Sequence, residues 1–370
     1  MSSSRGRGST AEYDGFGIDA PMRGYRRSHC PCLVPALRFP AIIAATALLT
    51  ACSNTSAAST DTRATTADST ATPSVTDGLA IDTVFGAVTP NSAASTGKVP
   101  VLMVHLVADT DAMWTITRAR FRHTLETLYA HDYRPITVAQ LIDRRIDVPA
   151  GKRPVVFTFD DASASQFRYI EKNGKLEIDP ESAVGIWLAF SQKHPDWKPR
   201  ATFCLLSGAE AGRSFFGNKD IEGQKTEWRF RKLQFLHERG FELCNHTLWH
   251  AKLSKYPDGF VQEQIARGQL AIDSAVPGYK VRTFALPLGL WPKNRTLAQR
   301  GEWKDPKSGA VTRYDHDAIL EVAGGPSRSP FDTAFNARAI KRYNVYMTSV
   351  DSLVARLERS NSGYVVPAPR

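Results

Sequence analysis

Between residues 99 and 370, short apolar runs alternate with longer stretches in which apolar residues recur at helical spacing. Each short run is followed by turn or polar residues, which is typical of buried strands. The runs that predict strands are 101–106, 155–159, 201–206, 241–245, 281–286 and 318–322. The stretches that predict helices are 118–131, 228–239, 261–275 and 350–358. Because strands and helices alternate, the pattern favours an α/β fold in which a parallel sheet is covered by helices and closed into a barrel.

One insertion interrupts this alternation at about residues 163–198, beside the end of the second predicted strand. Asn173-Gly174, between two short runs, is a strong signal for a β-hairpin. Asp179-Pro180 then predicts a helix, with Asp as its cap and Pro at its first position. The hairpin and the helix should therefore project beside any functional residues at the end of the second predicted strand.

Residues 1–52 are interpreted as an export signal. The apolar run 41–49 follows several arginines and is too short to span a bilayer, which needs about 20 apolar residues. Its end, Leu-Thr-Ala-Cys52, resembles the lipobox of bacterial lipoproteins, so Cys52 is predicted to carry a lipid. A cleaved signal in which Cys52 is incidental is the alternative, and Met22 is an alternative start.

Residues 53–98 are predicted to form a disordered tether. In 53–76, 18 of 24 residues are Ser, Thr or Ala, so almost no apolar surface offsets the entropy lost on ordering. A single folded domain is expected over 99–370. The protein would then be exported and held by a lipid anchor at a membrane, facing the periplasm or the cell exterior.

The composition is that of a globular protein, with 42% hydrophobic residues and a net charge of +10 from 47 basic and 37 acidic residues. The basic residues are scattered and form no compact run, so nucleic acid is a poor fit as a partner. An anionic envelope polymer is compatible with the mild positive charge.

Two of the five cysteines, Cys204 and Cys244, fall in the folded part. Each lies in an apolar run that predicts a buried strand, so the sequence favours free core thiols over a disulfide. No Cys-x-x-Cys pair occurs in the folded part, which makes a cysteine zinc site improbable.

Polar residues follow two of the predicted strands. Asp160 and Asp161 end the second strand, while His246 and His250 follow the fourth. Adjacent carboxylates at a buried strand end are costly unless a cation or hydrogen bonds compensate them, and imidazole is a common ligand of divalent metals. One carboxylate and two histidines would leave a coordination position open, as in catalytic metal sites. Taken singly, the Asp pair could be a solvated turn and the His pair could be incidental, but both follow strands of the same predicted sheet.

These motifs resemble those of the polysaccharide deacetylases, carbohydrate esterase family 4. The family's Thr-Phe-Asp-Asp motif stands at 158–161 and its Asn-His-[Ser/Thr]-x-x-His motif at 245–250. The VPVLMVH, ATF and ALPLG segments extend the resemblance over nearly all of 99–350.

The resemblance implies a distorted (β/α) barrel with seven strands and a divalent metal, usually zinc. It implies Asp161, His246 and His250 as metal ligands and Asp160 as the general base. A backbone N–H of the 287–289 loop, at Leu288, could contact the oxyanion. Among aromatic residues near the site, Trp249 and Trp291 could stack on sugar rings, although core packing is the ordinary use of such side chains.

The sequence departs from the family at two places. The position at which the family carries an arginine that orients the base is Ala285 here. The family's C-terminal histidine, its general acid, is absent because no histidine follows His316. His105, at the end of the first strand, could point into the site instead, or could be a buried histidine bonded to backbone.

The sequence therefore predicts a metal-dependent deacetylase that removes acetyl groups, N-acetyl rather than O-acetyl, from an envelope or extracellular polysaccharide. Peptidoglycan, a chitin-like polymer, poly-N-acetylglucosamine and acetylated xylan are the candidate substrates. Because of the two departures, the alternative is a catalytically impaired, carbohydrate-binding lipoprotein of the same fold. An amide hydrolase acting on a small non-sugar substrate is a third hypothesis.

Overall fold

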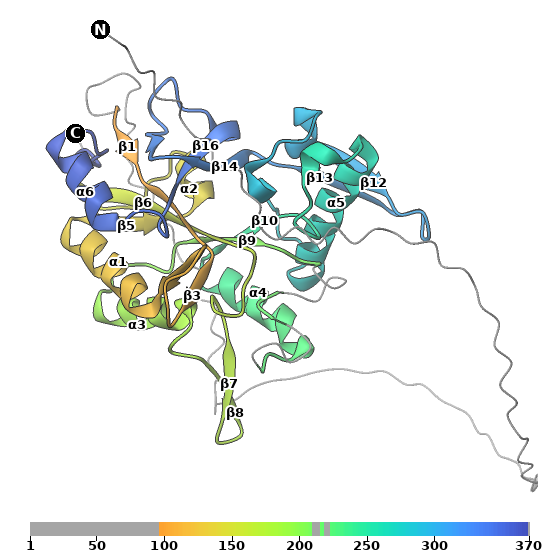
Figure 1. Ribbon diagram of the computed structural model, residues 1–370, viewed down its shortest axis with the longest axis horizontal. Coiled ribbons are helices and arrows are strands. Elements are labelled where there is room, and N and C mark those ends of the chain that lie inside the picture. The colour runs from red at the N-terminus through yellow and green to blue at the C-terminus, as the bar shows by residue number, and fades with distance from the viewer. Residues whose placement is uncertain (1–95, 209–214, 218–222, 369–370) are drawn as a thin grey trace, which may run out of the picture. The chain divides into compact units, whose positions relative to one another are not determined.

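Seven parallel strands form a closed ring in the computed structural model, which describes residues 96–208, 215–217 and 223–368 (Figure 1). The sheet has the order β2-β16-β14-β11-β10-β9-β6-β5, and β2 also pairs with β6, so β5 alone lies outside the ring. The ring strands are β2 (Val101–Val104), β6 (Arg153–Asp160), β9 (Thr202–Leu205), β10 (Glu242–Asn245), β11 (Thr283–Ala285), β14 (Ala318–Gly324) and β16 (Ile340–Asn344). The expected seven-stranded barrel is confirmed.

The longest ring strand, β6, organises the closure. One edge of β6 pairs with β2, while its other edge pairs first with β5 (Tyr133–Ile136) and then with β9. Pro135 is tolerated in β5 because this strand lies at the edge of the sheet. The pairing between β10 and β11 is short, and Asn245 lies opposite Phe284 in it. The barrel is therefore distorted, as expected.

Helices cover the outside of the barrel. They are α1 (Arg118–Ala130), α2 (Val138–Ile142), α3 (Ala183–Lys193), α4 (Arg229–Glu238), α5 (Asp258–Ala275) and α6 (Val350–Arg359). Ser349 caps α6 as predicted, because its side chain accepts a hydrogen bond from the backbone N–H of Ser352. The helices α1, α3 and α6 lie side by side on one flank (Figure 1). Among the described residues, none of the helices has the length and apolar character needed to span a bilayer.

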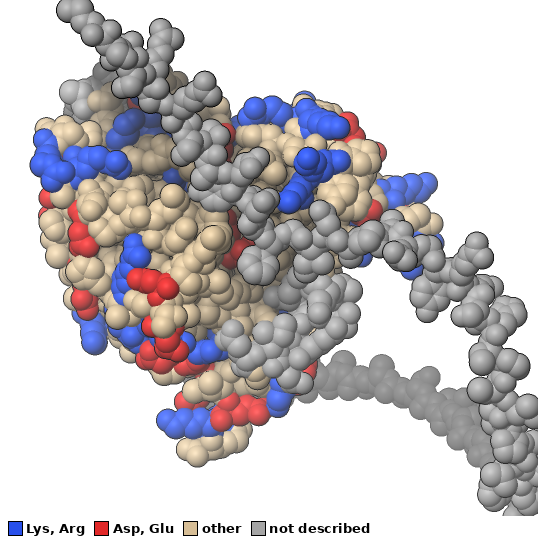
Figure 2. All heavy atoms as spheres, viewed as in Figure 1, with Lys and Arg blue, Asp and Glu red and all other residues tan. Residues whose placement is uncertain are grey.

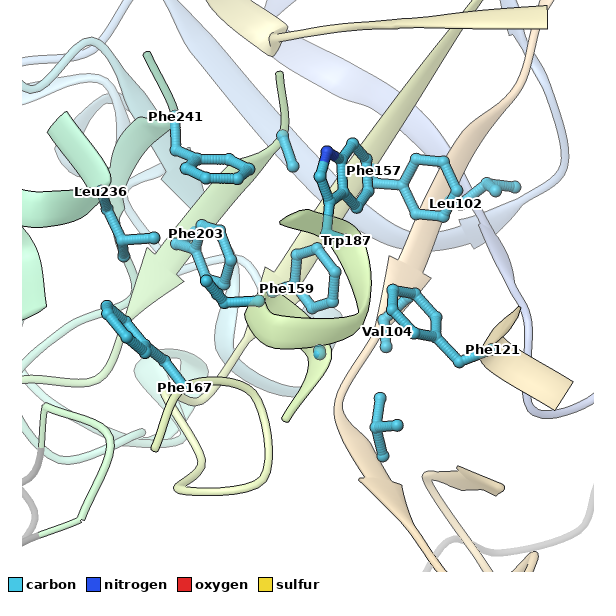
Figure 3. Close-up of a cluster of buried hydrophobic side chains, with 14 of the residues drawn as sticks. Leu102, Val104, Phe121, Phe157, Phe159, Phe167, Trp187, Phe203, Leu236 and Phe241 are labelled. Atoms are coloured by element: carbon cyan, nitrogen blue, oxygen red, sulfur yellow. The ribbon is translucent and has the colours of Figure 1, made fainter. Parts of the chain in front are cut away.

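Alternate strand residues pack on opposite sides of the barrel wall. Phe157, Phe159 and Phe203 face the helices and pack with Trp187 of α3 in a large aromatic cluster (Figure 3). The interior side chains belong to a second cluster that includes Val156, Cys204, Cys244, Ala285, Leu320 and Ile340. By the same alternation, Asp160 follows Val156 at two-residue steps and lies at the carboxyl end of the interior.

The prediction of free thiols is wrong, because Cys204 and Cys244 form a disulfide. The parallel register of β9 and β10 places the two cysteines directly opposite each other inside the barrel. This pairing was not visible in the sequence, where 40 residues separate them.

The insertion contains the expected hairpin, formed by β7 (Tyr169–Lys172) and β8 (Lys175–Ile178), which projects from the body (Figure 1). Asn173 and Gly174 both have positive φ, as a two-residue hairpin turn requires. The helix predicted to start at Asp179 instead begins after Ser182 as α3. Asp179 is engaged elsewhere, because its carboxylate accepts hydrogen bonds from Arg168 and from the backbone of Glu181.

Several elements were not predicted. The run at 101–106 is divided between β2 and β3 (Leu106–Ala108), which pairs with β4 (Thr115–Thr117). The strands β5 and β16, the helix α2 and the hairpin of β12 (Arg300–Lys304) and β13 (Val311–Asp315) were also missed. The short strands β1 (Lys98–Val99) and β15 (Ser327–Arg328) pair with each other. The predicted signal 1–52 and most of the tether lie outside the described residues.

On the face shown in Figure 2, basic and acidic side chains are interspersed over the described residues. No single-sign field of the kind that binds nucleic acid is visible on that face, which agrees with the scattered charges of the sequence.

Candidate functional site

The carboxyl ends of β6 and β10 bring together Asp161, His246 and His250. The potential ligand atoms of these three side chains all lie within 4.8 Å of one another. Oδ1 of Asp161 is 3.2 Å from Nε2 of His246 and 3.6 Å from Nε2 of His250. Asp161 and His250 both have left-handed backbone conformations, with φ of 75° and 56°. Such strained conformations often mark functional sites.

The imidazole of His246 has its orientation fixed by the barrel. Its Nδ1 donates a hydrogen bond to the carbonyl oxygen of Ala285 at 2.9 Å. In the neutral ring Nε2 is then an acceptor, and it faces Oδ1 of Asp161, which is also an acceptor. Both atoms are shielded from solvent and have no hydrogen-bond partner among the described residues. Two acceptors in this arrangement repel each other unless a proton on Nε2 or a metal ion lies between them.

The electrostatics of the cluster favour such a charge. Burial opposes a proton on His246, but the carboxylates of Asp161 and Asp160 outweigh burial and raise the pKa of the imidazole. Burial, and then the charge of His246, lowers the pKa of His250 to about 4. His250 is therefore neutral at neutral pH and free to bind a cation through its Nε2 lone pair. The two imidazoles and the carboxylate fit a divalent metal such as zinc.

Asp160 lies beside this cluster in a buried ion pair with Arg342. Nη1 and Nη2 of the guanidinium each lie 2.8 Å from one carboxylate oxygen of Asp160. The Arg342 side chain is 0% exposed and the Asp160 side chain 2% exposed. Burial opposes ionisation of Asp160, but the charges of Arg342 and His246 hold its pKa below its usual range. Asp160 is thus an ionised acceptor with a fixed orientation.

Sequence reasoning missed Arg342. The arginine of the resembling family was sought at Ala285, on β11, whereas Arg342 lies on β16, a strand that was not predicted. Its Nε donates to the carbonyl oxygen of Glu321 at 2.6 Å and its Nη1 to Oγ1 of Thr158 at 3.1 Å, so residues of β14 and β6 hold the guanidinium. The segment Ile340–Asn344, in which Arg342 lies between apolar residues, was the sequence signal that could have revealed this strand and its arginine.

His105 follows β2 and is half-buried. Burial lowers the pKa of its imidazole, while the charges of Asp161 and Asp160 raise it and those of Arg342 and His246 lower it, so all four groups lie near it. Its ring centroid is 4.8 Å from that of Trp114. No hydrogen bond joins the ring nitrogens of His105 to another described residue, which argues against the alternative of a histidine bonded to backbone.

Gln166 is a second residue that the sequence did not suggest. It is fully buried, and its Nε2 lies 2.5 Å from the carbonyl oxygen of His105 and 2.6 Å from that of Asp160. One amide group therefore fastens the end of β2 to the end of β6. This contact holds the backbones of His105 and Asp160 next to each other.

The remaining candidates lie on loops at the same end of the barrel. Leu288 has φ of 57° and is 39% exposed on the loop after β11. The indole of Trp291 is half-buried; its Nε1 lies 3.3 Å from Oε1 of Glu321 and the guanidinium of Arg295 lies 3.9 Å from its ring centre. Trp249 is 46% exposed.

Residues 193–301 match the family model for polysaccharide deacetylases. This segment is similar in sequence to polysaccharide deacetylases. The match includes His246 and His250 but begins after Asp160 and Asp161, so the fold is what unites the matched histidines with the two carboxylates. Together, the match and the site support an enzyme of the carbohydrate esterase class.

Solved deacetylase structures are similar to this chain. A polysaccharide deacetylase from Bacillus cereus shares 19% identity over 70% of this chain and 69% of its own, with a TM-score of 0.49. A Streptococcus pyogenes deacetylase in complex with acetate shares 13% identity over 70% and 98%, with a TM-score of 0.48. IcaB from Ammonifex degensii shares 17% identity over 70% and 96%, with a TM-score of 0.46. Among curated proteins, no sequence matches this chain.

Replacing Arg342 should destabilise the folded protein more than replacing an arginine on the surface does. Arg342→Met leaves the buried charge of Asp160 unpaired, so we expect the free energy of unfolding to fall by about 3–5 kcal/mol. The measurement is urea unfolding followed by circular dichroism.

Arg313→Met is the matched control, because Arg313 pairs with Glu302 at 3.1 Å with both side chains mostly exposed. The control should lose less than about 1 kcal/mol. Equal losses in the two variants would show that Arg342 does not keep Asp160 charged in the folded protein.

Proposed function

We propose that this protein is a metal-dependent deacetylase that removes acetyl groups, N-acetyl rather than O-acetyl, from an envelope or extracellular polysaccharide. The observation that carries the proposal is the convergence of Asp161, His246 and His250 next to the ionised, arginine-paired Asp160. The candidate polymers are peptidoglycan, a chitin-like polymer, poly-N-acetylglucosamine and acetylated xylan.

Asp161, His246 and His250 would hold the metal, for which zinc is the first choice because of the two imidazole ligands. When bound, a divalent ion supplies a Lewis acid that polarises the acetyl carbonyl and lowers the pKa of water. Three protein ligands leave room for a substrate oxygen, which is the arrangement of catalytic rather than structural sites.

Side chains and a backbone N–H around the metal position would accept the proton of water and stabilise the oxyanion. Asp160 is ionised and aligned by Arg342, so it can accept the proton of the attacking water. Each carboxylate oxygen retains a lone pair beyond the one that Arg342 uses. We assign a contact to the developing oxyanion to the backbone N–H of Leu288, on the loop after β11.

The leaving sugar nitrogen must receive a proton, and we assign its delivery to His105: the proton that Asp160 takes from water would pass through this imidazole, whose own pKa is lowered by burial. In the ring of strands, β2 neighbours β6 on one side, while β9 and then β10 follow on the other. His105 therefore follows the strand on one side of β6, whereas His246 and His250 follow a strand on its other side. A donor there can reach the departing amine without competing for the position between the ligands.

Acetate release from the four candidate polymers tests the activity and its dependence on metal. We expect the purified protein to release acetate from at least one polymer, to lose this activity with a chelator and to regain it with zinc. His246→Ala should lose bound metal and more activity than the roughly ten- to hundredfold typical of a lost outer-shell partner.

His123→Ala is the control, because the His123 side chain is 60% exposed and contacts Asp351 on the surface. It should retain both metal and activity. A protein that binds metal and glycans but releases no acetate would instead be the catalytically impaired carbohydrate-binding protein, the second candidate, which the missing C-terminal histidine favours.

The role of His105 is tested by comparing two leaving groups. His105→Gln should lower kcat on an N-acetyl sugar by about 10²-fold or more, because the amine leaves only when protonated. The same variant should hydrolyse 4-nitrophenyl acetate almost normally, since nitrophenolate needs no proton to leave. Equal losses on both substrates would assign His105 a structural role.

We also propose that residues 1–52 direct export, that 53–98 form a tether and that Cys52 carries the lipid. The support is the lipobox-like sequence and the Ser, Thr and Ala content after it. Cys52→Ser should move the protein from the membrane fraction to the soluble fraction of cells that express it, whereas Cys30→Ser should not. Retention of Cys52→Ser in membranes would exclude this anchor.

A further inference from the structure

Trp249 differs from every other tryptophan in the chain. It is 46% exposed, whereas Trp187 and Trp197 are buried and the remaining four are half-buried. It also directly precedes His250, so its Cα lies about 3.8 Å from that of a proposed metal ligand. The indole is therefore accessible to a ligand that binds beside the cluster.

The backbone of Trp249 is held firmly. Its N–H donates to Oε1 of Gln264 at 3.0 Å, and the N–H of Leu248 donates to the carbonyl oxygen of the same residue at 3.0 Å. Gln264 lies on α5 and is fully buried. The indole therefore extends from a backbone that is anchored to a helix rather than from a free loop.

The indole of Trp249 also contacts the guanidinium of Arg267. The guanidinium carbon of Arg267, on α5, lies 5.9 Å from the ring centre of Trp249 and 5.8 Å from that of Trp303. Both distances fall within the range of cation–π attraction. Glu263 pairs with Arg267 at 2.8 Å, so the charge of the guanidinium is already offset within the protein. Arg267 therefore orients the indole and leaves no net charge for a ligand to neutralise.

Other exposed apolar side chains occur on the same rim. Leu106 follows β2, while Leu288 and Leu290 follow β11, and they are 36%, 39% and 38% exposed. Because the strands of the barrel are parallel, these carboxyl ends share the face that bears Asp161 and the two histidines. The charged cluster is thus bordered by apolar side chains from separate strands.

We propose that Trp249 is the stacking platform of a sugar subsite, which binds the pyranose ring next to the sugar whose acetyl group is removed. A pyranose presents a face of C–H bonds to an indole and keeps its hydroxyl groups at the edge, where water can reach them. The proposal rests on the proposed function and adds to it the residue that binds the neighbouring sugar of the polymer. A single acetylated sugar would fill the reaction position and leave Trp249 uncovered.

The test compares Trp249→Ala and Trp249→Phe with the unaltered full chain. The probes are chitobiose, chitohexaose, a hexamer of poly-N-acetylglucosamine, acetylated xylohexaose and peptidoglycan fragments. On the best hexamer, Trp249→Ala should raise KM about tenfold with kcat changed less than about twofold, since aromatic stacking contributes about that factor. Trp249→Phe should stay close to the unaltered protein. Hydrolysis of 4-nitrophenyl acetate should not change, because this ester is too small to reach the platform.

Leu270→Ala is the matched control, since Leu270 lies on α5 and is 45% exposed, nearly the same as Trp249. It should leave KM unchanged. If Trp249→Ala leaves KM for the hexamer unchanged, or lowers activity on the small ester equally, the platform is excluded.

Calorimetric binding of the same oligomers to chelator-treated protein separates this proposal from the proposed function. If the unaltered chain releases no acetate but binds a hexamer about tenfold more tightly than Trp249→Ala does, the platform stands and the deacetylase proposal fails. If the unaltered chain binds none of the oligomers, the platform proposal fails whatever the activity.

Discussion

The site depends on how two adjacent carboxylates at the end of one buried strand are compensated. An uncompensated charge in such a place would cost several kcal/mol. Asp160 is neutralised inside the protein by Arg342, through two hydrogen bonds of 2.8 Å. Asp161 has no such partner, and its Oδ1 faces the Nε2 atoms of His246 and His250. One carboxylate is therefore satisfied by the chain itself, and the other is left for a cation.

This division follows from where the strand ends. Alternate residues of β6 point to the same side, so Asp160, its last residue, continues the interior row of Val156, while Asp161 lies beyond the strand. The left-handed conformation at Asp161, with φ of 75°, turns the chain at this point. Two residues of the same type thus acquire different surroundings, which suits one for accepting a proton and the other for binding a cation.

Closure of the barrel is what supplies the remaining groups. Because β2 pairs with both β16 and β6, the last strand of the ring lies close to the first two. Arg342 and His105 reach the carboxylates only for this reason, although 182 residues separate Arg342 from Asp160. An open sheet with the same strands would leave Asp160 without its arginine.

The sequence alone determined the elements whose signals are local. The alternation of apolar runs predicted the barrel, Asn173-Gly174 predicted the hairpin, and the two motifs predicted that Asp161 would meet His246 and His250. Local propensity was misleading at Asp179, whose carboxylate is occupied by Arg168.

Only the tertiary structure decided which distant side chains become neighbours. The Cys204–Cys244 disulfide depends on the register of two parallel strands, and the clamp by Gln166 depends on how two strand ends lie in space. The pairing of Arg342 with Asp160 depends on closure of the ring. Spacing along the chain carries no record of such contacts, because the free energy that selects them comes from burial and charge compensation after the strands have assembled.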